Sequence, residues 1–382
     1  MKNIISVLFF CLILLIGCKE PFTPEIDPQY KNLLVVEGYI NIGGETTIKL
    51  SRTGDLQDWQ SIIPEKNYNV EIEGDKGTIV IGVSEENGEA KLPTQNLNIT
   101  ERYKLRIISP QGKEYETDYL ESKVTPEIED VVFNTEESGF RIYVNTKDTN
   151  NNTRFYSWTY NETWEVNSTY GSTMEYLNGK LIPRNPDVNI KYCWASANSS
   201  SILIANSERL AEDKITLMPI AYVAGNSEKL AHLYSILVKQ YALTKEAYNY
   251  NEMMKKNTEK IGGIFDSQPS ELKGNIICVS NPKENVIGWI SAGTVTERRL
   301  FIGEEDKPKT SNDWMFSLSC SYYTQITPDS VVIYLNARNL IVTMSEGFLP
   351  GGEYHIEYNM ASESCIDCRL RGSNIKPDYW PN

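Results

Sequence analysis

The sequence predicts a mainly β protein in which an N-terminal immunoglobulin- or transthyretin-like sandwich is followed by a larger β-rich sandwich domain with one inserted α-helix. Three observations support this fold class. Short runs alternate apolar and polar residues with period two, as strands with one buried face do. The 23 tyrosines and the many β-branched residues favour sheet. Glycine, proline and asparagine separate the runs at short intervals, as turns require.

The N-terminal segment of the sequence predicts an export signal. The apolar run Ile4 to Ile16 follows a short basic start and ends in Leu15-Ile16-Gly17-Cys18, which resembles a bacterial lipobox. We therefore predict a lipoprotein signal peptide over residues 1–17 and lipid attachment at Cys18. An uncleaved transmembrane helix or an ordinary secretion signal is the alternative, but a span needs about 17 to 25 apolar residues and this run is shorter.

Residues 18–32 predict an extended tether. They contain Pro21, Pro24 and Pro28, which are incompatible with a helix and favour a spacer of about 3.1 Å per residue. We expect this tether to hold the first domain away from the lipid.

The pattern of residues 33–123 indicates the first sandwich domain. About seven short strands follow one another, with breaks at Gly43-Gly44, Gly74-Asp75, Asn87-Gly88 and Pro110-Gln111-Gly112. A small open barrel is the alternative for the same pattern.

We assign residues 124–382 to the larger β-rich domain. A helix is expected near 245–260, because Thr244 is a suitable N-cap and Gly262-Gly263 a suitable end. The tail carries a Cys-x-x-Cys motif. Strands are expected at Tyr234 to Leu243, Ile276 to Val279, Val286 to Ile290, Val295 to Ile302, Val331 to Leu335 and Tyr354 to Tyr358.

An aromatic-rich strand pattern between Arg154 and Tyr176 provides candidate binding residues, Trp158, Tyr160 and Trp164. Flat rings on a surface can stack on sugars or hold a partner. The competing interpretation, which we favour, is two buried sheet faces.

Five cysteines follow Cys18, so at most two disulfides can form within the mature chain. For Cys365 and Cys368 we favour structural disulfides, with Cys193 joined to one of the two; free thiols or a metal or redox site are the alternatives. Zinc would need two further Cys or His ligands, and the chain has only His232 and His355. We predict no metal and no cofactor.

Net charge and the absence of catalytic motifs limit the classes of function that the sequence supports. The chain has 37 basic and 51 acidic residues, and loss of Lys2 with the signal peptide takes its net charge from −14 to −15. Nucleic acid is excluded as a partner, because binding it depends on Lys and Arg at the phosphates. Neither histidine follows a Gly-x-Ser-x-Gly elbow, so we predict that the protein is not an enzyme, with a hydrolase as the alternative that the sequence leaves open.

Segments spread over most of the chain together resemble a family of Bacteroidetes outer-membrane lipoproteins, the domain of unknown function 4249. The resemblance implies an outer-membrane lipoprotein, often encoded beside a TonB-dependent transporter, and it transfers no catalytic residue. The segments are Cys18-Lys19-Glu20-Pro21-Phe22, Val35-Val36-Glu37-Gly38, Tyr192-Cys193-Trp194, Gly274 to Pro282 and Cys365 to Gly372 with Pro377 and Trp380.

We therefore expect a non-enzymatic, lipid-anchored accessory or binding protein of the cell outer membrane that works with a TonB-dependent transporter. The alternative is a surface glycan-binding lipoprotein that uses the aromatic patch. Lys19-Glu20 resembles a surface-export signal, which favours the cell surface over the periplasmic face.

Overall fold

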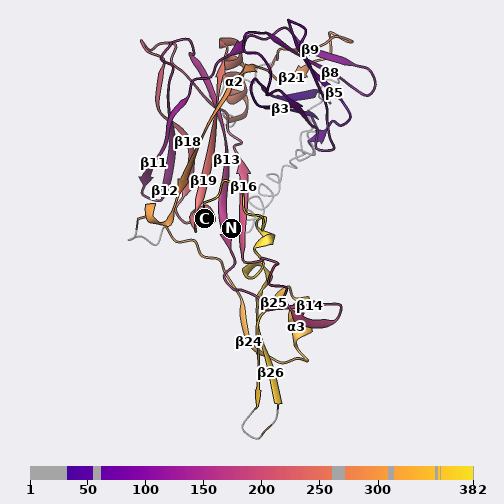
Figure 1. Cartoon of the computed structure of the whole chain (residues 1–382), viewed down its shortest axis with the longest axis vertical. Helices are drawn as coiled ribbons and strands as arrows, with labels where there is room; N and C mark the ends of the chain where they lie inside the picture. Colours follow the sequence, from indigo (N-terminus) through magenta and orange to yellow (C-terminus); the bar gives the residue numbers. More distant parts are fainter. Residues whose placement is uncertain are drawn as a thin grey trace, which may run out of the picture.

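The computed structural model describes residues 32–54, 62–259, 272–308, 314–348, 352 and 354–381. The chain is mainly β, with several antiparallel sheets, and this confirms the predicted fold class. Figure 1 shows three parts: a first sandwich at the upper right, a second sandwich at the upper left and a narrow distal module at the lower end.

The first sandwich consists of two five-stranded sheets and a small third sheet. One has the order β21-β1-β3-β4, with β7 also paired to β3; the other has the order β20-β9-β8-β5-β6. The third joins β10, β22 and β2. The strands are β1 (Leu34–Gly38), β2 (Ile40–Asn41), β3 (Glu45–Arg52), β4 (Ile63–Pro64), β5 (Asn69–Gly74), β6 (Ile79–Val83), β7 (Glu89–Pro93), β8 (Tyr103–Ile108), β9 (Glu114–Thr117), β10 (Ser122–Lys123), β20 (Ile276–Cys278), β21 (Val286–Ile287) and β22 (Ala292–Gly293).

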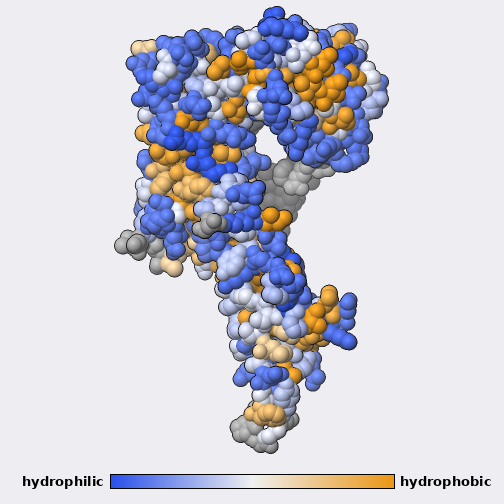
Figure 2. All heavy atoms as spheres, viewed as in Figure 1, coloured by the Kyte–Doolittle hydropathy of each residue, from blue (hydrophilic) through white to orange (hydrophobic). Residues whose placement is uncertain are grey.

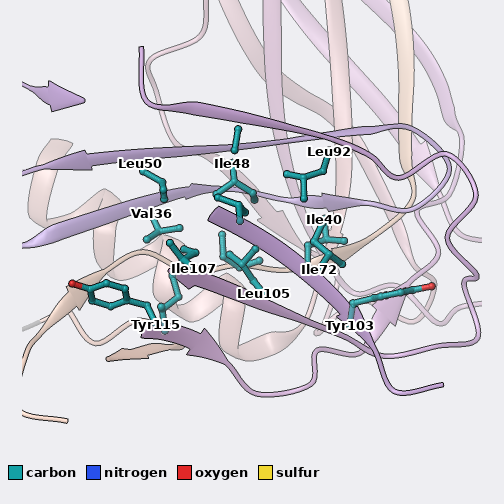
Figure 3. Close-up of a cluster of buried hydrophobic side chains, with 14 of the residues drawn as sticks. Val36, Ile40, Ile48, Leu50, Ile72, Leu92, Tyr103, Leu105, Ile107 and Tyr115 are labelled. Atoms are coloured by element: carbon teal, nitrogen blue, oxygen red, sulfur yellow. The ribbon is translucent and has the colours of Figure 1, made fainter. Parts of the chain in front are cut away.

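Alternation along each strand builds the core of this sandwich. In β5, Val70 and Ile72 are buried while Glu71 and Glu73 face outward. Figure 3 shows the side chains of both sheets meeting between them, with Leu105 among them. Burying a side chain of this size contributes about 1.5 to 3 kcal/mol.

Three strands of the first sandwich come from far along the chain. β20 pairs with β9, β21 pairs in parallel with β1, and β22 lies between β10 and β2. Gly288, just after β21, lies so close to β1 that a side chain there would collide with the Val36 carbonyl oxygen. These strands lie within the range 124–382 that we assigned to the second domain, so the chain leaves the first sandwich and returns to it.

The second sandwich packs the sheet β11-β12-β18 against the sheet β16-β13-β19-β23, in which β17 also pairs with β13. One core holds residues of both sheets, among them Phe140 and Ile236. The strands are β11 (Ile128–Glu136), β12 (Gly139–Lys147), β13 (Phe155–Asn167), β16 (Tyr192–Asn198), β17 (Leu203–Asn206), β18 (Lys214–Ala224), β19 (Tyr234–Leu243) and β23 (Val295–Ile302), with the 3-10 turns η2 (Glu228–Leu230) and η3 (Glu304–Asp306).

Helix α2 (Lys245–Glu259) occupies the predicted helical segment. The hydroxyl of Thr244 accepts a hydrogen bond from the backbone N–H of Ala247 at 3.2 Å, as an N-cap does. The predicted end at Gly262-Gly263 lies outside the described residues. No helix in the described part of the chain is long and apolar enough to span a bilayer.

The distal module contains the sheet β24-β26-β25 and a separate hairpin of β14 and β15. Its β25–β26 hairpin forms the lower end of the molecule in Figure 1. Bounds are β14 (Met174–Leu177), β15 (Lys180–Pro183), β24 (Tyr322–Ile326), α3 (Val331–Asn336), β25 (Asn339–Phe348), β26 (Tyr354–Ser362), η5 (Glu363–Cys365) and η6 (Cys368–Leu370).

The strand that we predicted at Val331 to Leu335 is wrong, because this segment forms helix α3. The backbone N–H of Val331 bonds to the carbonyl of Thr327, which closes a helical turn. Val331, Tyr334 and Leu335 then share one face at helical spacing and pack on the core of the module. Tertiary packing outweighs the β propensity of the segment.

Candidate functional site

A cleft of about 560 Å³ lies between the two sandwiches. One wall comes from the first sandwich, through β1, β3 and the segment around Trp289. The opposite wall comes from β13, β17, β19 and β23 of the second sandwich and from helix α2. Figure 2 shows an opening between the two upper lobes of the molecule. Ligand sites are common at such junctions between domains.

The first wall is the outer face of a sheet. In β1, Leu34 and Val36 are buried in the core, while Val35 and Glu37 alternate with them and border the cleft. β3 adds Glu45 and Thr47 in the same way, at the other end of the face. Strand alternation therefore places carboxylates and apolar groups side by side on this wall. 

The second wall is the outer face of the opposing sheet. β13 contributes Ser157 and Thr159, and β19 contributes Lys239 and Tyr241. The ammonium group of Lys239 forms an ion pair with Glu297 at 2.9 Å. This wall therefore brings hydroxyl groups, an aromatic ring and a neutralised charge pair to the cleft.

Two aromatic contacts connect the walls. Tyr39 of the first sandwich meets Tyr241 edge to face, with ring centroids 4.9 Å apart, and its hydroxyl donates a 3.4 Å hydrogen bond to the Ala242 carbonyl. Burial raises the pKa of Tyr39, so its hydroxyl stays protonated. Tyr250 of α2 contacts Trp289, with centroids 5.5 Å apart. Such pairs are worth about 0.5 to 1.5 kcal/mol beyond burial, and they hold the cleft in a preformed shape.

The predicted aromatic residues do not form an exposed patch. Trp158 is 1% exposed, and its ring nitrogen donates a 2.8 Å hydrogen bond to Gln240. Tyr160 and Trp164 are half-buried and pack on the core of the second sandwich. Trp158 is thus a core residue and not an exposed binding residue, in line with the buried sheet faces that we favoured. Even-numbered positions of this part of β13 face the core and the odd-numbered Ser157 faces the cleft, which Trp158 only borders. The glycan-binding alternative built on these rings loses its support.

None of the candidate disulfide residues, Cys193, Cys365 and Cys368, lines the cleft. Cys193 is joined to Cys368, and Cys320 to Cys365, so the two cysteines of the Cys-x-x-Cys motif have different partners. Cys278 is a buried free thiol. Within the described ranges no group of three or more His, Cys, Asp or Glu side chains could hold a metal ion. Cys18 lies outside the described residues.

Sequence reasoning missed the cleft. Its walls combine β1 and β3 with strands and a helix more than a hundred residues later in the chain. The one available signal was local: hydroxyl residues alternate with aromatic residues along β13, which distinguishes its outer face from its inner face.

Comparison with known proteins identifies a family for this chain. No curated protein matches the chain. The family model described as Domain of unknown function (DUF4249) matches residues 19–299, a range that holds every residue of the cleft lining and all strands of both sandwiches except the end of β23. The distal strands β24, β25 and β26 follow that range. The chain therefore belongs to the DUF4249 family.

Proposed function

We propose that this protein is a non-enzymatic, lipid-anchored accessory or binding protein of a Bacteroidetes outer membrane, and that it works with a TonB-dependent transporter. The observation that carries the proposal is the apolar run that ends at Cys18. Two or more acyl chains on that cysteine would anchor the protein stably. The preformed cleft supports a binding role for the folded part.

An exposed edge strand supports the transporter as a partner. β6 is the last strand of its sheet and pairs only with β5 among the described residues. Ile79, Ile81 and Val83 alternate along it and are 62%, 59% and 49% exposed. Monomeric proteins usually shield such edges with charge or proline, so an uncovered aliphatic edge is suited to a protein partner.

Labelling with radioactive palmitate tests the anchor. We expect the wild-type chain to incorporate label and to partition into detergent, and we expect Cys18→Ser to lose both properties. Incorporation of label by Cys18→Ser would contradict lipid attachment at this residue.

Co-purification from solubilised outer membranes tests the partner. A transporter barrel should accompany the wild-type protein, and Ile81→Lys should weaken this association. Ile375→Lys, at an exposed aliphatic residue in the C-terminal tail, serves as the matched control. Isolation without a barrel under all mild detergent conditions would contradict the proposal. Protease treatment of intact cells distinguishes the favoured surface location from the periplasmic face.

A further inference from the structure

We propose that the cleft between the sandwiches binds a small organic cation, a ligand with ammonium or guanidinium groups on an apolar stem. Short basic peptides and polyamines share this chemistry. The inference names a ligand class for the proposed binding function and rests on it.

The unpaired charge of the cleft is negative. Glu37 and Glu45 lie on the same wall, are exposed to solvent, and form no ion pair with any described residue. Lys49 lies opposite Glu37 on the neighbouring strand, but no ion pair joins these two described side chains. Lys239 is already neutralised by Glu297. Carboxylates in a cleft with low-dielectric walls raise the local concentration of cations.

The rings and apolar groups of the lining fit the stem of such a ligand. Tyr241 and Trp289 contribute aromatic surface from opposite walls, and Val35 and Met254 contribute aliphatic surface. Tyrosine and tryptophan faces attract ammonium and guanidinium groups within about 6 Å. A cation with an apolar stem therefore meets both kinds of contact in one cleft.

Tyr250 provides an independent sign of a ligand. Its side chain is 6% exposed and borders the cleft. Its hydroxyl lies beside the Gly288 backbone, yet it forms no hydrogen bond of ordinary geometry with any described group. Buried hydroxyls are normally hydrogen-bonded. The negative charge of Glu37 reaches this hydroxyl, because it adds to the rise in the pKa of Tyr250 that burial causes.

The size and shape of the cleft suit a small ligand. Its volume of about 560 Å³ falls within the range of roughly 300 to 1,000 Å³ that is usual for small-molecule sites. The two aromatic bridges, Tyr39 with Tyr241 and Tyr250 with Trp289, keep the walls apart before a ligand enters. Preformed walls reduce the cost of ordering on binding.

Titration calorimetry on the full-length lipidated protein in a non-ionic detergent tests the inference. The probes are spermidine, trilysine and, as the acidic counterpart, triglutamate. We expect at least one cationic probe to bind, with an affinity that falls as salt rises, and no binding of triglutamate. Glu37→Gln and Glu45→Gln should each weaken binding about three- to tenfold. Glu137→Gln removes the same charge from an exposed site outside the cleft and should leave the affinity unchanged.

The outcomes separate the ligand sources and the two proposals. Binding of spermidine alone identifies a polyamine site, and binding of trilysine alone identifies a peptide site; both support a cationic ligand. Binding of neither probe, or equal binding by the Glu37→Gln and Glu45→Gln variants, overturns the inference. Palmitate labelling of Cys18 and co-purification of a barrel do not depend on the cleft. If they succeed while both cationic probes fail, only the ligand class is wrong.

Discussion

The first sandwich and the distal module hold together in different ways. The first sandwich has a large continuous core to which all its sheets contribute, and its Cys278 thiol is free. The distal module has a much smaller core, and the disulfide between Cys320 and Cys365 encloses it. That core consists of Ile326, Val331, Ile341, Tyr358 and Met360.

The difference shows that burial of apolar side chains can stabilise the first sandwich without a cross-link, whereas the distal module also has a disulfide. Small modules bury a smaller fraction of their surface than large ones, so their cores contribute less stability. A disulfide offsets this shortage by reducing the freedom of the unfolded chain. The disulfide between Cys320 and Cys365 lies within the small distal module, whereas the one between Cys193 and Cys368 joins β16 of the second sandwich to the C-terminal segment.

The largest effect is expected from removing the cross-link of the distal module. Cys320→Ala with Cys365→Ala opens a loop with a sequence separation of 45 residues, which costs about 4 kcal/mol in the chain-entropy model. Amide hydrogen exchange should accelerate in β24, β25 and β26 and remain unchanged in β5 and β8. Unchanged protection of the distal strands would show that their small core is sufficient.

A core truncation should produce the reverse pattern. Leu105→Ala in the first sandwich removes a fully buried side chain and should cost about 2 to 5 kcal/mol. Denaturant unfolding measures the loss, and hydrogen exchange should assign it to the first sandwich. Ile81→Ala, at an exposed position of β6, is the control and should change stability by less than about 0.5 kcal/mol.

A smaller effect is expected at Glu284, which ties the returning segment to the first sandwich. Burial raises the pKa of its carboxyl, but hydrogen bonds from Lys113 and Tyr115 outweigh burial and hold the pKa below its usual value. Because this pKa is lower in the folded protein, the ionised carboxylate stabilises the fold at pH values above the pKa of the unfolded chain, near 4.5. This contribution is lost as pH falls through the pKa of the folded protein.

Glu284→Gln should therefore cost about 1 to 3 kcal/mol at pH 7. Its melting temperature should also fall less steeply than that of the wild type between pH 5 and pH 3. Parallel melting curves for the two proteins over this range would contradict the role of the carboxylate.

The smallest effect concerns Cys278, which reports on the first sandwich alone. Burial raises the pKa of its thiol, so the unreactive protonated form dominates at neutral pH. Reduction of the two disulfides should leave Cys278 unlabelled by iodoacetamide, as mass spectrometry can check. Rapid labelling after mild reduction would show that the two regions unfold together.

The local structure of both regions could largely be predicted from sequence. The short alternating strands of the first sandwich and the start of α2 after Thr244 were predicted correctly. Contacts between distant segments could not be predicted, because period-two patterns do not identify the partner of a strand. The return of β20 to β9 depends on such contacts.

The cleft was beyond sequence reasoning for a related reason. Glu37 and Glu45 look like ordinary solvent-facing residues of a half-buried sheet, since nothing in their neighbourhood shows that a second sandwich faces them. Only the path of the chain between the sandwiches brings Lys239 and Tyr250 opposite them.

The late return of β20 to β9 affects the order in which the protein folds. Its pairing joins Ile276 to Thr117, about 160 residues earlier in the chain. At a synthesis rate of about 5 to 20 residues per second, roughly 10 to 30 s separate the two strands. The part of the chain made first is therefore completed late, and until then the edge of β9 that pairs with β20 stays open.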